Sequence, residues 1–180
     1  EDGIADKGRL NQPIEVHNNI AYGNGASWPG NEGPEKLVDG NFGTKYLSWA
    51  GAGAGVIVTA TGGASTIDGL VFSTANDTEN GDPAAYILYG TNDAITTTTN
   101  NHGDENWTKI SSGALALPAG RNVQGAQTVT FANTEAFTSY QLVFTEPKRL
   151  INQTRGEDRM QIAEVQFQSG GADVAVGSAI

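Results

Sequence analysis

Three oxygen-bearing side chains follow one another closely in the segment 37–49, which reads LVDGNFGTKYLSW. Asp39, Asn41 and Thr44 offer a carboxylate, an amide oxygen and a hydroxyl, and the intervening glycines allow bends that expose backbone carbonyls. Calcium binds roughly six to eight oxygens of these kinds. The segment is not an EF-hand, because that motif requires Gly where Thr44 stands. It predicts a calcium loop, with a plain Asx turn as the alternative.

Two tryptophans lie among turn-forming residues, Trp28 in NGASWPGNEG and Trp49 in YLSWAGAGAG. An aromatic ring packs on the apolar C–H face of a sugar, while the sugar hydroxyls need fixed polar partners. Both tryptophans are therefore candidate stacking platforms, and the alternative is that they plug the end of a hydrophobic core. Trp107, in NWTKI, directly precedes a predicted strand, which favours a place in the core.

The polar segment 146–159, EPKRLINQTRGEDR, concentrates cations in a chain of net charge −10. Such side chains donate hydrogen bonds to sugar hydroxyls. The candidate polar ligand contacts are Arg149, Asn152, Arg155 and, directly after the Asp39 loop, Lys45. The alternative is a solvated loop whose arginines pair with nearby acids.

The segment 74–83, TANDTENGDP, crowds several acids around Asn80-Gly81, which is a strong turn signal. We expect a hairpin whose acids cap backbone amides, with a second cation site or a sugar-contacting loop as alternatives.

No set of residues indicates catalysis. Most acids lie in expected turns or in the predicted calcium site, and neither His17 nor His102 lies near an activated serine. The GAGAG run at 51–55 lacks the Lys-Ser/Thr ending of a phosphate-binding loop. We expect the chain not to be an enzyme.

The composition of the 180 residues indicates one all-β domain. Gly is abundant (24 residues), and charged residues make up only 17%. There is no cysteine, so neither disulfides nor thiolate metal sites are available. The acidic charge disfavours binding to nucleic acid or to an anionic membrane, and no apolar run is long enough to cross a membrane.

Short β-branched and aromatic runs predict about eight main antiparallel strands in a β-sandwich jelly roll. We expect strands at 14–22, 56–60, 65–74, 84–91, 107–111, 127–132, 137–145 and 161–168. A single helical turn is expected at 34–38. The polar start (1–12) and the small-residue end (170–180) are expected to be linkers, which leaves the domain at 13–169.

The last two strands differ in their pattern. Tyr140, Leu142 and Phe144 alternate regularly, whereas the alternation of 161–168 breaks at Glu164. This break predicts a bulge or a special site at Glu164.

The runs VDGNFGTKY, DPAAYILYGTND and QIAEVQF, in this order over residues 14–168, resemble the galactose-binding-like sandwich. That fold occurs in discoidin domains, coagulation-factor C domains and family thirty-two carbohydrate-binding modules. The resemblance implies one structural Ca²⁺ with carboxylate ligands from Asp39 and Glu164. The remaining implied ligands are Thr44 and the backbone oxygens of Lys36, Asn41 and Ala163.

The resemblance also implies a function. We expect a non-catalytic module that binds a polysaccharide or oligosaccharide and thereby targets a secreted bacterial parent enzyme to it. The catalytic domain is expected elsewhere in the parent chain. An adhesion domain of the discoidin type, acting at the cell surface, is the alternative.

Overall fold

The computed structural model describes residues 28–49, 51–96, 105–148 and 159–177. The strand predicted at 14–22 and the linker predicted at 1–12 lie outside these ranges. None of the helical segments in the described ranges has the length and hydropathy that a membrane crossing requires.

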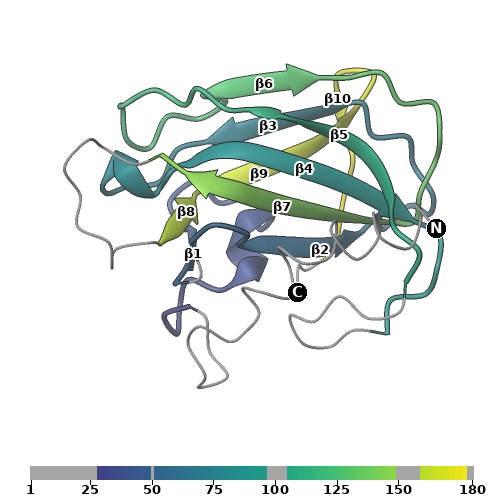
Figure 1. The fold of residues 1–180 in the computed structure, drawn as a ribbon, viewed down its shortest axis with the longest axis horizontal. Helices are drawn as coiled ribbons and strands as arrows, with labels where there is room; N and C mark the ends of the chain where they lie inside the picture. Colours follow the sequence, from purple (N-terminus) through teal and green to yellow (C-terminus); the bar gives the residue numbers. More distant parts are fainter. Residues whose placement is uncertain (1–27, 50, 97–104, 149–158, 178–180) are drawn as a thin grey trace, which may run out of the picture.

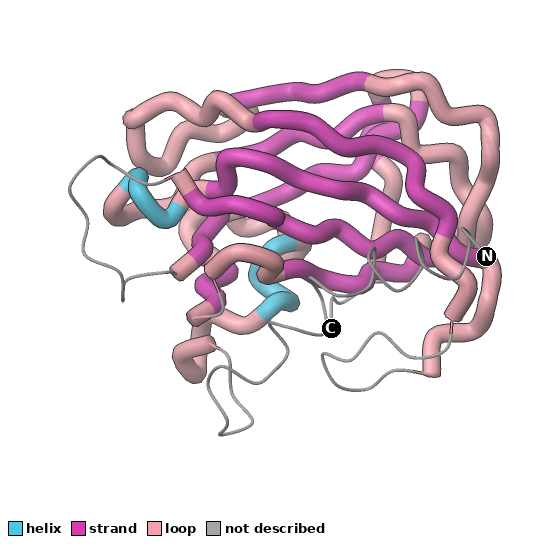
Figure 2. The backbone as a smooth tube through the Cα atoms, viewed as in Figure 1, coloured by secondary structure: helices cyan, strands magenta, loops and turns pink. Residues whose placement is uncertain are grey.

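The described residues form an all-β fold, as the sequence predicted. Its strands are β1 (Tyr46–Ser48), β2 (Gly55–Thr59), β3 (Gly69–Ser73), β4 (Pro83–Thr91), β5 (Thr108–Ala114), β6 (Gln127–Thr130), β7 (Ser139–Pro147), β8 (Met160–Ile162), β9 (Glu164–Ser169) and β10 (Ala172–Asp173). The helical turns in the same ranges are the 3₁₀ segments η1 (Pro34–Leu37) and η2 (Glu79–Gly81), drawn in cyan in Figure 2. η1 confirms the turn expected at 34–38, whereas η2 was not predicted.

Two antiparallel four-stranded sheets form the layers of the sandwich (Figure 1). One has the strand order β10-β9-β3-β6 and the other the order β2-β7-β4-β5. A separate pair joins β1 to β8, with Ser48 opposite Met160. Most strand neighbours are distant in sequence, so the sandwich depends on packing between remote segments.

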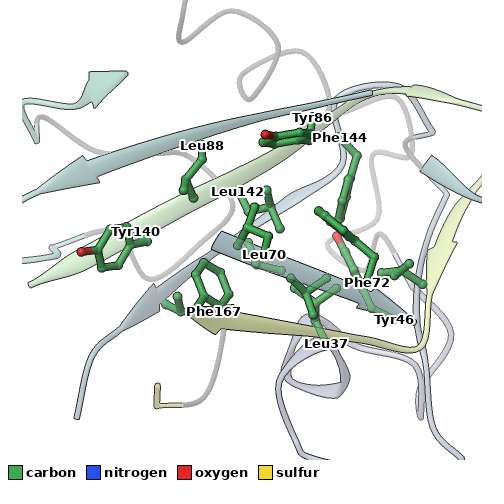
Figure 3. Close-up of a cluster of buried hydrophobic side chains, with 14 of the residues drawn as sticks. Leu37, Tyr46, Leu70, Phe72, Tyr86, Leu88, Tyr140, Leu142, Phe144 and Phe167 are labelled. Carbon is green, nitrogen blue, oxygen red and sulfur yellow. The ribbon is translucent and has the colours of Figure 1, made fainter. Parts of the chain in front are cut away.

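The main core lies between the two sheets (Figure 3). Phe72 enters it from β3, while Tyr140, Leu142 and Phe144 enter it from β7, which confirms the alternation predicted for that strand. The rings of Phe72 and Phe144 lie 6.4 Å apart at 65°, an edge-to-face arrangement favoured between aromatic rings.

Trp107 is buried, as predicted for a core aromatic. It belongs to a second, smaller cluster with Ile57, Tyr89 and Val143. Val143 follows Leu142 of the main core on β7, so this cluster lies on the outer face of the β2-β7-β4-β5 sheet.

The break in alternation at Glu164 is a change of sheet. The single residue Ala163 separates β8 from β9, and its N–H donates to the carbonyl of Ser73 at 3.0 Å. Ile162 pairs with β1, whereas Glu164 pairs with Ser73 at the end of β3. The strand predicted at 161–168 is therefore two strands, and Glu164 is the first residue after the switch.

The structure also extends the domain beyond its predicted end at residue 169. Gly170 and Gly171 have φ values of 57° and 81°, which reverse the chain so that β10 pairs with β9. Val174 N–H then donates to Phe167 O, and Gly177 N–H donates to Thr59 O, each at 2.7 Å. Residues 172–177, predicted to belong to a linker, thus pack onto both sheets.

Candidate functional site

The Asp39 loop folds around its own oxygen atoms. Thr44 Oγ1 lies 2.9 and 3.0 Å from the two carboxylate oxygens of Asp39 and donates to Asn41 O at 2.8 Å. The side-chain oxygen of Asn41 accepts from the N–H of Gly43, as in an Asx turn. The side chain of Asn41 is therefore used in the turn. Its backbone carbonyl and the carboxylate of Asp39 both lie within hydrogen-bond distance of Thr44 Oγ1.

Glu164 reaches this loop from the start of β9. The residue is 3% exposed, and its Oε2 is buried without a hydrogen-bond partner. Burial raises the pKa of Glu164 to about 7, opposed by a hydrogen bond to the backbone of Gly40, and the negative charge of Asp39 raises it further. The sequence-predicted pair of carboxylates is thus brought together, 125 positions apart in the chain (164 minus 39).

These residues fit a divalent cation with oxygen ligands. A buried carboxylate with one unpaired oxygen, near the charge of a second carboxylate, is stabilised by a positive charge between them. Lys36 Nζ lies 3.6 Å from Asp39 Oδ2 and already supplies one positive charge to that carboxylate. No group of three or more acidic or imidazole side chains placed for a metal occurs in the described ranges, so hydroxyl and carbonyl oxygens must supply the other ligands. The implied carbonyls of Lys36 and Ala163 belong to η1 and to the β8–β9 junction.

One end of the sandwich gathers the remaining candidate residues. We call it the Trp49 end and define it by Trp49 and the connections 51–54, 74–82 and 115–126, together with Lys148 and Arg159 (left side of Figure 1). Trp49 follows β1 and is 38% exposed, the highest exposure of any large hydrophobic side chain in the described ranges. Trp28 is half-buried and packs against the main core. Of the two predicted platforms, Trp49 is the accessible one.

Lys45 does not face solvent, in contrast to its predicted contact with sugar. Its side chain is 8% exposed, and Nζ lies 2.8 Å from Asp77 Oδ2 and 3.0 Å from Gln161 Oε1. Burial alone would raise the pKa of Asp77, but the hydrogen bond and charge of Lys45 lower it below its usual value. Because its ammonium group donates to protein acceptors, Lys45 is not among the sugar contacts that we propose.

The hairpin predicted for the segment 74–83 is wrong, because β3 and β4 on either side of it belong to different sheets. The acids of residues 77–82 pair with lysine and arginine side chains from other loops. Arg121 binds the buried carboxylate of Asp82 with two bonds, of 2.8 and 2.6 Å. Lys148 Nζ lies 2.9 Å from Glu79 Oε2. Burial raises the pKa of Asp82, and the bond to Arg121 opposes that rise. The segment is folded by partners from other loops, which no local turn signal reveals.

Two polar groups that the predicted site did not include lie at the Trp49 end. Ser48 is paired with Met160, so Trp49 and Arg159 are the next positions along the β1–β8 pair. Arg159 Nη2 lies 3.2 Å from Thr78 Oγ1, while its Nε is buried without a partner. Asn80 Oδ1, in η2, is likewise buried without a partner. Arg159 and Asn80 are nevertheless partly exposed as residues. An exposed aromatic ring accompanied by partly exposed polar side chains is the chemistry that a sugar requires.

Arg149, Asn152 and Arg155 lie outside the described residues. Their predicted contacts with ligand therefore stay predictions. The cationic character of their segment was nevertheless the signal that pointed to Arg159. Asn80 gave no such signal, because Asn-Gly is typical of an ordinary turn.

Solved carbohydrate-binding modules share this fold. CBM32-3 from a family 31 glycoside hydrolase of Clostridium perfringens matches with a TM-score of 0.57 at 17% identity, over 79% of this chain and 85% of that chain. The fold is that of family 32 modules. CpGH89CBM32-5 from the same organism, in complex with GalNAc-β-1,3-galactose, matches with a TM-score of 0.53 at 21% identity, over 80% and 91% of the two chains.

A further match is the chitosan-binding module 2 of a chitosanase/glucanase from Paenibacillus sp. IK-5, in complex with chitotriose. Its TM-score is 0.51 at 20% identity, over 80% of this chain and 92% of that chain. No protein-family model matches the sequence, and no curated protein matches it. The resemblance inferred from the sequence is confirmed for the fold.

Proposed function

We propose that this domain is a non-catalytic carbohydrate-binding module of the family 32 type that binds glycan at the Trp49 end. The observation that supports this most directly is exposed Trp49 with the partly exposed Arg159 at the next position of the β1–β8 pair. Arg159 and the partly exposed Asn80 each keep one polar atom without a hydrogen-bond partner among the described residues. The sugar ring stacks on Trp49, and its hydroxyls bond to Arg159 and Asn80. The contacts predicted for Arg149, Asn152 and Arg155 from the sequence belong to the same proposal, and these residues lie outside the described ranges.

The proposal includes one structural calcium ion held by Asp39, Thr44 and Glu164 with backbone oxygens of Lys36, Asn41 and Ala163. The ion supplies the positive charge that the buried Glu164 carboxylate lacks. Glu164 starts β9, and only Ala163 separates it from the end of β8. Calcium bound at Glu164 would therefore fix the end of β8, the strand that begins at Met160 directly after Arg159.

Solved relatives of this fold come from carbohydrate-active enzymes. We infer by analogy that this module belongs to a secreted bacterial enzyme and raises the local concentration of a catalytic domain at a polysaccharide. Shallow sites of this kind contribute affinity through a few contacts and do not enclose the ligand.

The test is affinity electrophoresis against neutral and anionic polysaccharides, with calcium and with chelator. We expect retardation by at least one polysaccharide, lost in Trp49→Ala and kept in Trp28→Ala, because Trp28 packs against the core and is less accessible. Trp49→Phe, which keeps a ring, should retain part of the binding. Absence of retardation across the panel, or equal retardation of Trp49→Ala and wild type, would reject the proposal and favour an adhesion domain.

A further inference from the structure

Lys45 is a buried cation at the Trp49 end that the proposed glycan contacts do not use. It precedes β1 and contacts two residues distant in sequence, Asp77 in the β3–β4 connection and Gln161 in β8. Glu32 also lies 3.8 Å from Nζ. A buried ammonium is tolerated only when charged and polar partners satisfy it, and here three segments supply those partners.

A continuous chain of hydrogen bonds leads from Lys45 to Arg159. Gln161 is fully buried; its Oε1 accepts from Lys45, so its Nε2 faces the opposite way and donates to Thr78 O at 2.7 Å. Thr78 Oγ1 in turn accepts from Arg159 Nη2 at 3.2 Å. Lys45 thus fixes the orientation of the Gln161 amide, which fixes the backbone at Thr78, against which the guanidinium of Arg159 rests.

The same bonds hold η2 in place. Thr78 is the residue before η2, and Gly81 within it lies so close to β8 that an added Cβ would be 3.1 Å from Gln161 Cγ. Asn80 lies between these two contacts. The positions of Asn80 and Arg159 relative to each other therefore depend on the bonds that begin at Lys45.

We propose that Lys45 is a positioning residue of the glycan site: through Asp77, Gln161 and Thr78 it sets the geometry of Asn80 and Arg159 without touching the ligand. The expected effect of Lys45 on glycan affinity rests on the proposed function. Its expected effect on the segment 77–82 rests on the hydrogen bonds described above alone. A positively charged residue that binds anionic sugar directly would have to be accessible, and Lys45 is not.

The affinity test is a double-mutant cycle with Arg159. Dissociation constants are measured by calorimetry for GalNAc-β-1,3-galactose and chitotriose, with calcium present. We expect Lys45→Met to weaken binding about tenfold in the wild-type background and less than about twofold in an Arg159→Gln background, because coupled residues are not additive. Equal losses in the two backgrounds would overturn the proposal, since general destabilisation acts in both.

The second readout needs no ligand. Hydrogen exchange of the unliganded protein should show amides of residues 77–82 exchanging at least about tenfold faster in Lys45→Met, with β7 unchanged. Lys109→Met, which removes an exposed cation from β5, is the control and should leave hydrogen exchange in the segment 77–82 unchanged.

If Lys45→Met fails to fold, Gln161→Met breaks the same chain of hydrogen bonds and keeps the ion pair between Lys45 and Asp77. Unchanged exchange in the segment 77–82 would overturn the positioning role of Lys45, even if no glycan probe binds. Faster exchange without any glycan binding would reject only the proposed glycan-binding function.

Discussion

At the scale of single residues, Glu164 connects the fold to the ion that we propose. Its carboxylate is almost completely buried, lacks a partner at Oε2 and lies near the charge of Asp39. In calcium-free protein, ionisation of Glu164 therefore opposes folding. A bound divalent cation reverses that effect, because the ionised carboxylate then becomes a ligand.

The pH dependence of calcium-free stability should reveal this residue. Burial raises the pKa of Glu164 from 4.5 to about 7, so between these values the native state holds a proton that the unfolded state has released. The free energy of unfolding should fall as pH rises through this window, by up to about 3 kcal/mol, and level off above it. Urea unfolding from pH 4.5 to pH 8 in calcium-free buffer measures the effect.

The matched control for this measurement is Glu164→Gln, which has no charge to bury. Its stability should lack this component of the pH dependence and should no longer rise when calcium is added, whereas calcium should stabilise the wild type at pH 7 and above. A wild-type protein whose stability is the same with and without calcium would contradict the site.

At the scale of elements, the segment 77–82 shows why the site was only partly predictable. The sequence suggested a hairpin at Asn80-Gly81, yet Lys45, Arg121 and Lys148 bind the acids on either side and η2 forms instead. Turn propensity is a local signal, whereas these three cations come from remote parts of the chain. In contrast, the Asp39 loop was predictable because its oxygens are close in sequence.

Loss of Arg121 should strongly destabilise the domain. The carboxylate of Asp82 is 0% exposed, so Arg121→Met leaves a buried charge without its main partner, at a cost of about 3 to 5 kcal/mol. Adding Asp82→Asn should recover a large part of that cost, because the neutral amide no longer requires a cation. Denaturant unfolding of the two single variants and the double variant measures the coupling, and strictly additive costs would show that the ion pair is not the cause.

A second element-scale prediction concerns β4, where Gly90 lies against the ring of Phe137. A Cβ at this position would overlap the ring, so Gly90→Ala should destabilise the protein by about 1 to 3 kcal/mol through overpacking. Gly113 on the neighbouring β5 is the control, since a Cβ there would lie 3.5 Å from Tyr86 Cε1, an ordinary contact. Gly113→Ala should change the midpoint of thermal unfolding little.

At the scale of the whole molecule, the alternation of apolar residues predicted the sandwich and most of its long strands. Tyr140, Leu142 and Phe144 enter the core as expected, because a strand with one buried face must alternate. The short strands β1 and β10 were missed, since two or three residues carry no period. The break at Glu164 was visible in the sequence, but that it marks a change of sheet depends on pairing with β1 and β3, which local sequence does not encode.

The C-terminal segment gives a prediction for the domain as a unit. A chain that ends at residue 169 loses the hydrogen bonds of Val174 and Gly177 and the apolar contacts of Val174 and Val176 with the core. We expect a loss of about 2 kcal/mol and a fall of roughly 4 to 8 °C in the thermal midpoint. A chain that ends at Gly177 keeps these contacts and is the control; equal midpoints for the two truncations would show that residues 172–177 do not stabilise the fold.

The ion pairs around the segment 77–82 also bear on how this protein can change over evolution. Arg121 and Asp82 depend on each other, so replacement of either residue alone destabilises the folded protein. The two positions should therefore covary in related sequences. Trp49 has no such dependence, because its ring faces solvent. A lineage can therefore exchange the residue that we propose as the sugar platform, and with it the preferred ligand, while the ion pairs of the segment 77–82 stay the same.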